Sequence, residues 1–354
     1  MEQRAIFVSG GAGFIGSNFI RYLLKSLLDV HLVIFDKLTY AGNLENLAYI
    51  CDDPRVRFVH GDICDTEVVS KAMKGCSQVI HFAAETHVNR SIVDPGTFMR
   101  TNVEGTFTLL ESARRLGIER FIHISTGEVY GNAEAPDGTM RPSVETDPFK
   151  PLSPYAVSKA EADKLAFSYW THFGVPVVIT RGSNCYGHYQ YPEKQLPLFI
   201  THALYGRFLP IYGNGRNVRD WIYIDDYCAA LMSILIAPAD LVVGEIFNIG
   251  TGDERNILQN AHAVLDLLAL PSNRITFVGD RPGHVRYRSN DACKLRKRLG
   301  WLPRINFHEG LERTVEWYCD HRSWLEHVLA KQDDSVKSYQ ALVISGVLML
   351  NEQV

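Results

Sequence analysis

The stretch AIFVSGGAGFIG, residues 5–16, decides the fold expected for this chain. Its first five residues form an apolar run that predicts a buried strand, and a helical pattern follows from Ile15 to about Leu28. Glycines between them let the backbone turn tightly and approach a ligand without an intervening Cβ. A pyrophosphate then binds the free N–H groups at the positive end of the helix. The stretch therefore predicts a dinucleotide site whose contacts are Gly10, Gly13, Phe14, Ile15 and Gly16.

An acidic residue supports this interpretation. Asp36 ends the second apolar run twenty residues after Gly16. A carboxylate at that place accepts hydrogen bonds from the ribose hydroxyls and repels a 2′-phosphate, which favours NAD over NADP. The positive charge of Lys37 beside it weakens this preference for NAD over NADP. The alternative to a dinucleotide site is a glycine turn that binds no ligand.

A third contact is expected near the adenine. Asp62 and Ile63 follow the third strand-like run and are placed to reach the adenine edge. Asp62 could equally be a helix cap.

Strand-like and helical segments alternate through the first half of the chain. This alternation predicts an α/β fold, a Rossmann-type doubly wound parallel sheet covered by helices on both faces. The expected strands are 5–9, 31–35, 56–59, 79–82, 121–125 and 175–180, and the expected helices between them include 68–73, 101–116 and 154–173.

The alternation becomes irregular after residue 182. Short strands are expected at 221–224, 246–249 and 274–278. We expect residues 1–182 to form the NAD-binding domain with the catalytic residues. Residues 183–332 then form mainly a smaller substrate-binding domain, interleaved with the first, and residues 333–354 form a C-terminal tail.

The composition limits the function classes. The chain has 354 residues, 46% hydrophobic and 21% charged, with a net charge of −4. This balance gives no reason to expect nucleic-acid or membrane-surface binding. Seven cysteines without a Cys-x-x-Cys pair favour reduced thiols and no metal site. With no signal-peptide pattern and a longest apolar run half the length of a membrane span, we expect a cytoplasmic protein.

A tyrosine and a lysine form the expected catalytic pair. Tyr155 and Lys159 are spaced i, i+4 at the start of a predicted helix, so their side chains share one face. The ammonium and a positively charged nicotinamide lower the pKa of the phenol, which can then take a proton from a sugar hydroxyl. Ser125 and Thr126, at the carboxyl end of a strand, can share that proton network. Tyr-x-x-x-Lys also occurs by chance on helices.

Several longer motifs carry a family resemblance. They are DKLTYAGNL (36–44), GDICD (61–65), HFAAETHV (81–88), STGEVYG (125–131), YPEK (191–194) and RDW (219–221). From about residue 4 to residue 320 the chain resembles the extended short-chain dehydrogenase/reductase superfamily, and within it the dTDP-glucose 4,6-dehydratases. The resemblance implies NAD as a recycled cofactor with Ala83 among its contacts. It also implies a homodimer that pairs through helices 101–116 and 154–173.

The resemblance implies a reaction. Hydride moves from C4 of the hexose to NAD, the ketone acidifies C5, and the hydride returns to C6 as the C6 hydroxyl leaves. Tyr155 is then the C4 base, Lys159 its tuner, Thr126 a partner of the C4 oxygen and Glu128 the C5 base. Glu128 could instead be a solvated loop residue.

One departure from the family pattern falls in the catalytic segment. The aspartic acid that protonates the leaving C6 hydroxyl falls at Gly127, which cannot donate a proton. General acid catalysis is worth ~10²–10⁴-fold, so this departure matters. Three hypotheses follow: another proton donor in a 4,6-dehydratase, a related C4-oxidising enzyme, or a catalytically impaired binding paralogue. The related enzymes are a UDP-glucuronate decarboxylase, a UDP-N-acetylglucosamine 5,6-dehydratase or an epimerase. The first hypothesis predicts that Gly127→Asp raises dehydration.

The substrate is expected to be a nucleotide-diphosphate sugar. Arg219, with Arg286 behind it, can grip the diphosphate in a bidentate way, although Arg219 could instead pair with Asp220 or Asp225. The segment GHVRYR (283–288) departs from the family and leaves the nucleotide open, dTDP or UDP. The other substrate contacts that the resemblance implies are Thr86, Thr126, Asn184, Lys194 and Asn248.

Overall fold

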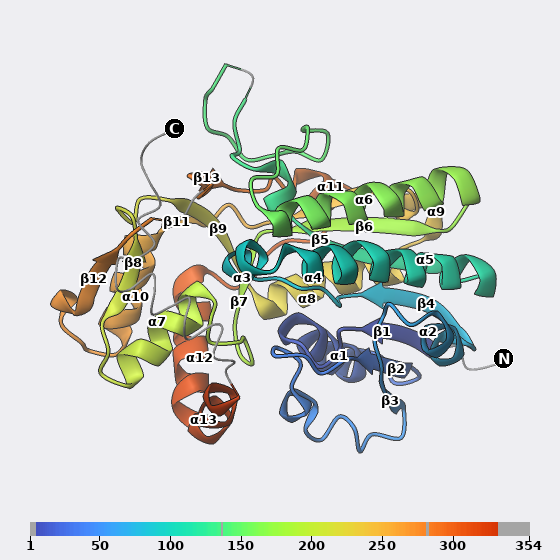
Figure 1. The fold of residues 1–354 in the computed structure, drawn as a ribbon, viewed down its shortest axis with the longest axis horizontal. Helices are drawn as coiled ribbons and strands as arrows, with labels where there is room; N and C mark the ends of the chain where they lie inside the picture. The colour runs from blue at the N-terminus through green and yellow to red at the C-terminus, as the bar shows by residue number, and fades with distance from the viewer. Residues whose placement is uncertain (1–4, 136, 281–282, 332–354) are drawn as a thin grey trace.

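The centre of the molecule is a parallel sheet. A computed structural model describes residues 5–135, 137–280 and 283–331. Its largest sheet has seven strands in the order β10-β6-β5-β4-β1-β2-β3 (Figure 1). They are β1 (Ala5–Ser9), β2 (His31–Asp36), β3 (Val56–His60), β4 (Cys76–His81), β5 (Arg120–Thr126), β6 (Val177–Gly182) and β10 (Ile246–Ile249).

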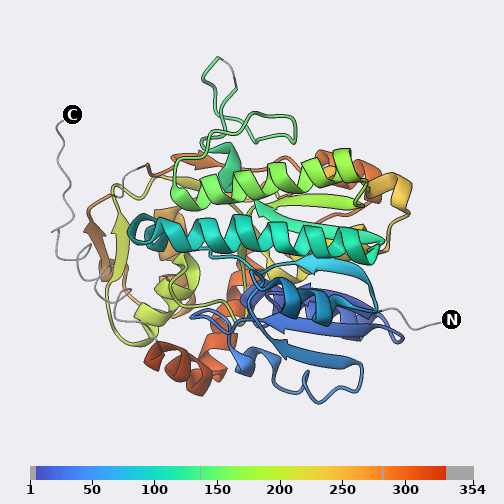
Figure 2. The ribbon, with the colours of Figure 1, turned by 45° about the vertical axis from the view of Figure 1, so that its right-hand side comes forward.

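Helices cover both faces of this sheet. α2 (Thr66–Met73), α5 (Gly105–Leu116) and α6 (Pro154–Phe173) pack on one face, where α5 and α6 lie side by side (Figure 2). α1 (Phe14–Ser26) and α8 (Ile224–Ile236) pack together on the other.

The strand sequences explain the two covered faces. Along β1, Phe7 joins one buried cluster, whereas Ile6 and Val8 join the other. Strands such as β1 and β2 are buried on both faces, which gives the unbroken apolar runs seen in the sequence. The predicted doubly wound sheet is confirmed.

Local chemistry sets the ends of the helices. Ser153 caps α6, Pro154 occupies its first turn, and Gly174 ends it in the left-handed region at φ 68°.

The helix predicted at 101–116 is longer than expected. α4 (Pro95–Met99) runs through a π-helical turn (Arg100–Glu104) into α5.

Residues after 182 contribute to both parts of the molecule. β10 returns to the large sheet, while a smaller sheet orders β11 (Glu254–Asn256), β9 (Val218–Tyr223) and β13 (Tyr287–Arg288), with β7 (Asn184–Tyr186) on β9. β8 (Leu209–Tyr212) pairs with β12 (Ile275–Val278).

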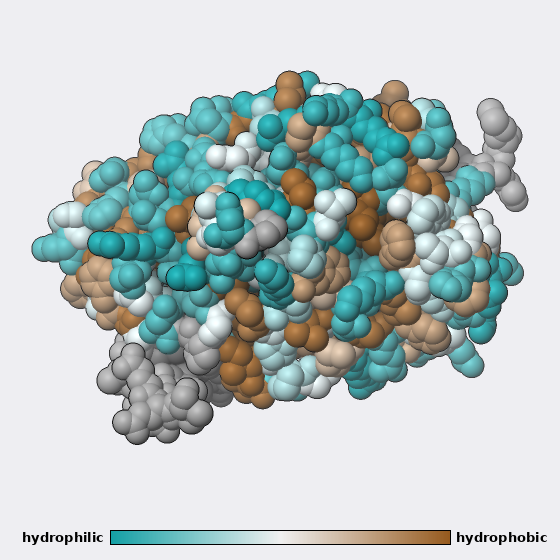
Figure 3. Space-filling view, turned by 90° about the horizontal axis from the view of Figure 1, so that it is seen from above, coloured by the Kyte–Doolittle hydropathy of each residue, from teal (hydrophilic) through white to brown (hydrophobic). Residues whose placement is uncertain are grey.

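Further helices and turns complete the described part of the chain. They are α3 (Val88–Val93), α7 (Gln195–Leu204), α9 (Ala239–Val242), α10 (Ile257–Leu267), α11 (Cys293–Leu299), α12 (Phe307–Asp320) and α13 (Arg322–Ala330), with 3₁₀ turns at Leu44–Leu47, Gly127–Tyr130 and Ser272–Arg274. The predicted tail, 333–354, lies outside the described residues. In the part of the chain that the structure describes, no helix is long and apolar enough to cross a membrane. The face seen from above carries mostly hydrophilic side chains with scattered hydrophobic ones (Figure 3).

The topology places the site. The strand order reverses between β1 and β4, and such switch points leave a crevice at the carboxyl ends of the strands where ligands bind.

Candidate active site

The turn after β1 accepts only glycine at two positions. Gly10 has φ 73°, and a Cβ there would lie 2.4 Å from the backbone N of Ala83. A Cβ on Gly16 would lie 2.3 Å from the carbonyl oxygen of Gly10. Gly13 caps α1 without a side-chain bond, so the N–H groups of the first turn stay available to an anion. These residues, with Phe14 and Ile15, line a cavity of about 350 Å³.

Asp36 is held at the rim of that cavity. Its buried carboxylate accepts hydrogen bonds from the N–H groups of Ala12 (2.9 Å) and Leu38 (2.8 Å). Lys37, next to Asp36 in the sequence, forms an ion pair with the Asp62 carboxylate, with its Nζ atom 2.7 Å from that carboxylate.

Asp62 does not cap a helix. The residue that caps α2 is Asp65, and Asp62 lines the cavity with Ile63 and Ala83.

Tyr155 and Lys159 reach the same cavity from α6, opposite Ser125 and Thr126 at the end of β5. Lys159 Nζ donates to the carbonyl oxygen of Ile124 at 2.7 Å. Burial lowers the pKa of Lys159 to about 8.

The net effect of the protein's own groups is to raise the pKa of Tyr155. Burial and the nearby Glu128 carboxylate raise that pKa, against the effects of a hydrogen bond with Thr126 and the charge of Arg288. The chain by itself therefore does not give the lowered Tyr155 pKa that the sequence predicts.

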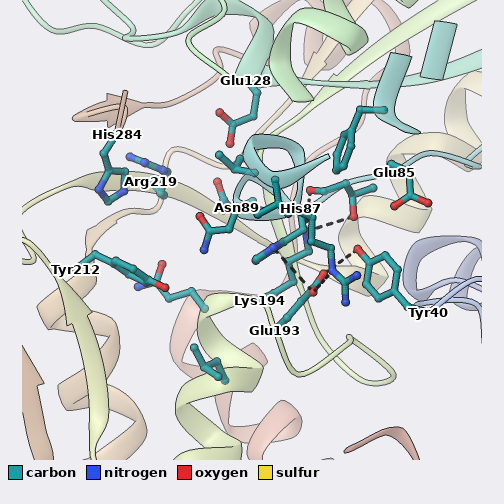
Figure 4. A pocket seen from close by; sticks show the side chains of 18 of the residues that line it. Tyr40, Glu85, His87, Asn89, Glu128, Glu193, Lys194, Tyr212, Arg219 and His284 are labelled. Carbon is teal, nitrogen blue, oxygen red and sulfur yellow. Dashed lines mark hydrogen bonds and ion pairs between the residues drawn. The ribbon is translucent and has the colours of Figure 1, made fainter. Parts of the chain in front are cut away.

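A second cavity of about 530 Å³ adjoins the first. Figure 4 shows Glu128 pointing into it, with Arg219 and His284 at one end and Glu85 and Tyr40 at the other. The two cavities are neighbours, because both are lined by Glu85, Thr86, Glu128, Asn184, Glu193, Lys194, Gln195 and Arg288.

Buried polar contacts shape the wall between the cavities. Lys194 Nζ donates to the carbonyl oxygen of Thr86 at 2.9 Å. The fully buried Glu193 carboxylate accepts from Tyr40 Oη (2.9 Å) and Arg90 Nε (3.1 Å). Sequence reasoning missed Glu193 as a structural anchor of this wall, although it lies inside the YPEK motif.

Arg288 was also missed. It forms an ion pair with Glu128 and donates a hydrogen bond to Asn184 Oδ1. Its side chain is 9% exposed. β13 pairs in parallel with β9 so that Arg288 stands in register with Arg219, which puts both side chains on one face of the small sheet.

The missing carboxylate position is closed by a neighbour. A Cβ on Gly127 would lie 2.5 Å from Asn290 Oδ1 and 2.7 Å from Asn290 Nδ2. The Asn290 amide is fixed there, because it donates to the carbonyl oxygen of Arg181 at 3.1 Å.

Two expected substrate residues do not reach either cavity. Asn248 is fully buried, accepting from Tyr130 Oη at 2.8 Å and donating to the Ser143 carbonyl at 2.8 Å. Arg286 has a 74% exposed side chain, 3.7 Å from Glu134. Arg286 lies just before β13. Arg288, within β13, lines the cavities where Arg286 was expected to lie.

Arg219 lines the second cavity. Its guanidinium donates to the carbonyl oxygens of Val218 and Val285, both at 2.7 Å. Asp220, one of the alternative partners, is hydrogen-bonded by Ser183 Oγ at 2.6 Å and by Thr251.

A glycine turn at the switch point of a doubly wound sheet, with Tyr155 and Lys159 facing Thr126, defines an extended short-chain dehydrogenase/reductase. The model of the GDP-mannose 4,6 dehydratase family matches residues 7–314. A dTDP-glucose 4,6-dehydratase of Streptomyces niveus is 45% identical over 325 residues, covering 91% of this chain and 94% of the relative. The chain belongs to this family of nucleotide-sugar dehydratases.

Solved structures agree with that assignment. DesIV, a dTDP-glucose 4,6-dehydratase from Streptomyces venezuelae crystallised with NAD, superposes with a TM-score of 0.87 at 43% identity, covering 92% of this chain and 99% of its own. A UDP-glucuronic acid 4-epimerase from Bacillus cereus, in complex with UDP-glucuronic acid and NAD, gives a TM-score of 0.83 at 29% identity, covering 89% and 99%.

Proposed function

We propose that this chain is an NAD-dependent 4,6-dehydratase that converts a nucleoside diphosphate hexose to a 4-keto-6-deoxyhexose. The observation that carries the proposal is the junction of the two cavities, where Tyr155, Thr126 and Glu128 face one space. A thymidine nucleotide is favoured over a uridine nucleotide, because the dTDP-glucose enzymes are the more similar of the relatives described above.

The dinucleotide cavity fits NAD. A Cβ at Gly10 would clash with the backbone of Ala83, and a Cβ at Gly16 with the backbone of Gly10. Glycine therefore keeps the tight turn that leaves the start of α1 open to a pyrophosphate. Asp36 faces the ribose position, and the neighbouring Lys37 forms an ion pair with Asp62. When bound, NAD supplies the acceptor for the C4 hydrogen and later returns that hydrogen.

The chain's own residues move the protons. Tyr155 takes the proton of the C4 hydroxyl, and Thr126 is its hydrogen-bonding partner. Glu128 takes the C5 proton once C4 is a ketone. Its carboxylate forms an ion pair with Arg288, which holds it at the junction of the two cavities.

The second cavity accommodates the nucleotide sugar. Arg219 is the proposed diphosphate ligand, and Asn184, Lys194 and Thr86 lie where the sugar joins the dinucleotide cavity. Arginine suits this role because a planar guanidinium matches two phosphate oxygens.

Product analysis tests the proposal. Purified protein is incubated with NAD and either dTDP-glucose or UDP-glucose, and the products are identified by NMR. We expect a 4-keto-6-deoxy sugar nucleotide, formed slowly because residue 127 offers no acid. Binding of both sugar nucleotides without any turnover would instead support a binding paralogue.

A homodimer in the cytoplasm is part of the proposal. Exposed apolar side chains gather on α5 and α6, namely Phe107, Leu116, Val157, Phe167 and Phe173. Such a surface suits pairing with a second copy.

Seven unpaired cysteines suit a reducing compartment such as the cytoplasm. Sedimentation equilibrium and cell fractionation test the two statements.

A further inference from the structure

A buried aspartate stands one turn from the lysine of the catalytic pair. Asp163 follows Lys159 by four residues on α6, so the two side chains lie on one face of the helix. Both residues are buried, Asp163 at 1% exposed and Lys159 at 4%. Lys159 lines the dinucleotide cavity, whereas Asp163 lines neither cavity. Asp163 can therefore act on the reaction only through a neighbour.

Asp163 belongs to a buried network behind the site. Arg181 Nε donates to Asp163 Oδ2 at 2.8 Å, and Arg181 Nη1 donates to Tyr130 Oη at 2.7 Å. The Arg181 guanidinium also lies 4.5 Å from the centre of the Phe149 ring. This network fixes the carboxylate through one oxygen. The other oxygen, Oδ1, is buried without a close hydrogen-bond donor, which is unfavourable for a carboxylate.

The charge of this carboxylate acts on Lys159. The Lys159 ammonium donates to the carbonyl oxygen of Ile124 at 2.7 Å. Burial lowers the pKa of Lys159, and the negative charge of Asp163 opposes that lowering. Burial likewise raises the pKa of Asp163, and the charges of Arg181 and Lys159 oppose that rise. Lys159 and Asp163 therefore stabilise each other's charged forms.

The strands beneath Lys159 supply no second negative charge. His81 on β4 and His123 on β5 are both buried. Burial, together with the charge of Lys159, lowers the pKa of each imidazole well below its ordinary value, so both are neutral at neutral pH. β6 contributes only the Arg181 guanidinium at this place, and Glu128, just after β5, pairs with Arg288.

The helices packed against α6 carry charges that have other partners. Glu111 pairs with Arg114 and Arg115, Arg90 pairs with Glu193, and Glu104 acts on the Cys64 thiol. Among the residues that the structure describes, Asp163 is thus the carboxylate that balances the charge of Lys159.

We propose that Asp163 is a positioning residue that keeps the Lys159 ammonium charged beside Tyr155 while Tyr155 takes the proton of the C4 hydroxyl. This inference rests on the C4 oxidation of the proposed function. A neutral amine at Lys159 would not stabilise the phenolate, so losing the Asp163 charge lowers the pH at which the pair stops working. Asp163 itself neither gives nor receives a proton in the reaction.

Two variants and a matched control test the proposal. Asp163→Asn removes the charge and keeps the size of the side chain, but it leaves Arg181 buried without its partner, which is strongly destabilising. The double variant Asp163→Asn/Arg181→Met removes both charges, a change that is often neutral for stability. Asp226→Asn is the control, because Asp226 is 3% exposed and accepts hydrogen bonds from the backbone N–H groups of Arg304 and Ile305. Thermal unfolding checks that each variant is folded.

NMR measures the titration of Lys159 directly, without substrate. Lysines carry carbon-13 at Cε, and Lys159→Met identifies the signal. We expect the titration to move about one pH unit lower in Asp163→Asn, less in the double variant, and not at all in Asp226→Asn. If Asp163→Asn does not fold, the double variant decides. A titration that stays at the parent value in either Asp163 variant overturns the proposal.

The pH dependence of C4 oxidation shows whether this charge matters to the reaction. The rate at which bound NAD is reduced is followed by NADH absorbance in the first turnover with dTDP-glucose. The ratio of the parent rate to the rate of a folded Asp163 variant is expected to rise about tenfold between about pH 6 and pH 8. For Asp226→Asn the ratio stays constant.

Other outcomes separate the claims. A shifted Lys159 titration with a rate ratio that does not change with pH overturns the role of Asp163 in the reaction. A parent that binds dTDP-glucose and UDP-glucose but reduces no NAD with either overturns the proposed function, whatever the titration of Lys159 shows.

Discussion

Gly127 and Asn290 share one space: the Cβ of any larger residue at 127 would lie 2.5 Å from Asn290 Oδ1. The two residues are far apart in the sequence, and β5 and the segment after β13 bring them together. The pair therefore decides whether an acid can stand at the C6 end of the site.

Gly127→Asp alone is expected to destabilise the protein and not to raise dehydration. The Cβ overlaps a buried amide, and overpacking of this kind costs about 1–3 kcal/mol. Asn290→Ala in the same chain opens the space, so the double variant is expected to regain stability and to dehydrate a hexose ~10²-fold faster or more than the parent. Denaturant unfolding and product formation measure both effects. A single variant that is as stable as the parent would show that the two side chains are compatible.

Stability is expected to rise with pH through the titration of Lys159. Burial lowers its pKa in the folded chain from 10.5 to about 8. Between these values the unfolded chain holds more protons, so the free energy of unfolding increases with pH, and below pH 8 the penalty is fully present. We define the difference as the free energy of unfolding of the parent minus that of Lys159→Met. This difference should rise by about 3 kcal/mol between pH 7 and pH 10.5. A difference that stays constant with pH would contradict the lowered pKa.

Asp36→Ala is expected to reduce the preference for NAD over NADP. The substitution removes the acceptor of the ribose hydroxyls and the carboxylate that would repel a 2′-phosphate. About 10–100-fold weaker NAD binding corresponds to one or two lost hydrogen bonds to a charged group. Calorimetric titration with both dinucleotides measures the ratio, with the exposed loop variant Asp137→Ala as control. Equal losses in the two variants would place Asp36 outside the cofactor site.

Phe107→Glu is expected to produce a monomer. Phe107 is 47% exposed on α5, on the surface proposed to pair with a second copy. A buried, unpaired charge at an interface is costly. Phe277→Glu is the control, since Phe277 is 61% exposed on β12, away from α5 and α6. A mass near one chain for the parent in sedimentation equilibrium would refute the dimer.

Local patterns predicted the elements that hold the cofactor. The strand β1, the glycine turn and the helix α1 are contiguous in the sequence within residues 5–26, so local patterns were enough to predict them. The same applies to α6, where the Pro154 start and the Gly174 stop are both visible in the sequence.

The substrate-binding residues were harder to predict, because their positions depend on the pairing of strands that lie far apart in the sequence. Both Arg286 and Arg288 lie in one short segment, and only the pairing of β13 with β9 turns Arg288 toward the cavity. Asn248 is a polar residue within β10 of the large sheet, and it hydrogen-bonds to Tyr130 and to the Ser143 carbonyl group instead of lining a cavity. Nothing local distinguishes these outcomes.

The most direct test of the central claim follows one deuterium atom. Nucleotide-linked glucose carrying deuterium at C4, on dTDP or UDP, is converted by the parent and by Tyr155→Phe, and NMR locates the label in the product. The account predicts that the parent delivers deuterium from C4 to C6 and that Tyr155→Phe loses this conversion while still binding the sugar nucleotide. Conversion that leaves the deuterium at C4, or that proceeds undiminished in Tyr155→Phe, would contradict it.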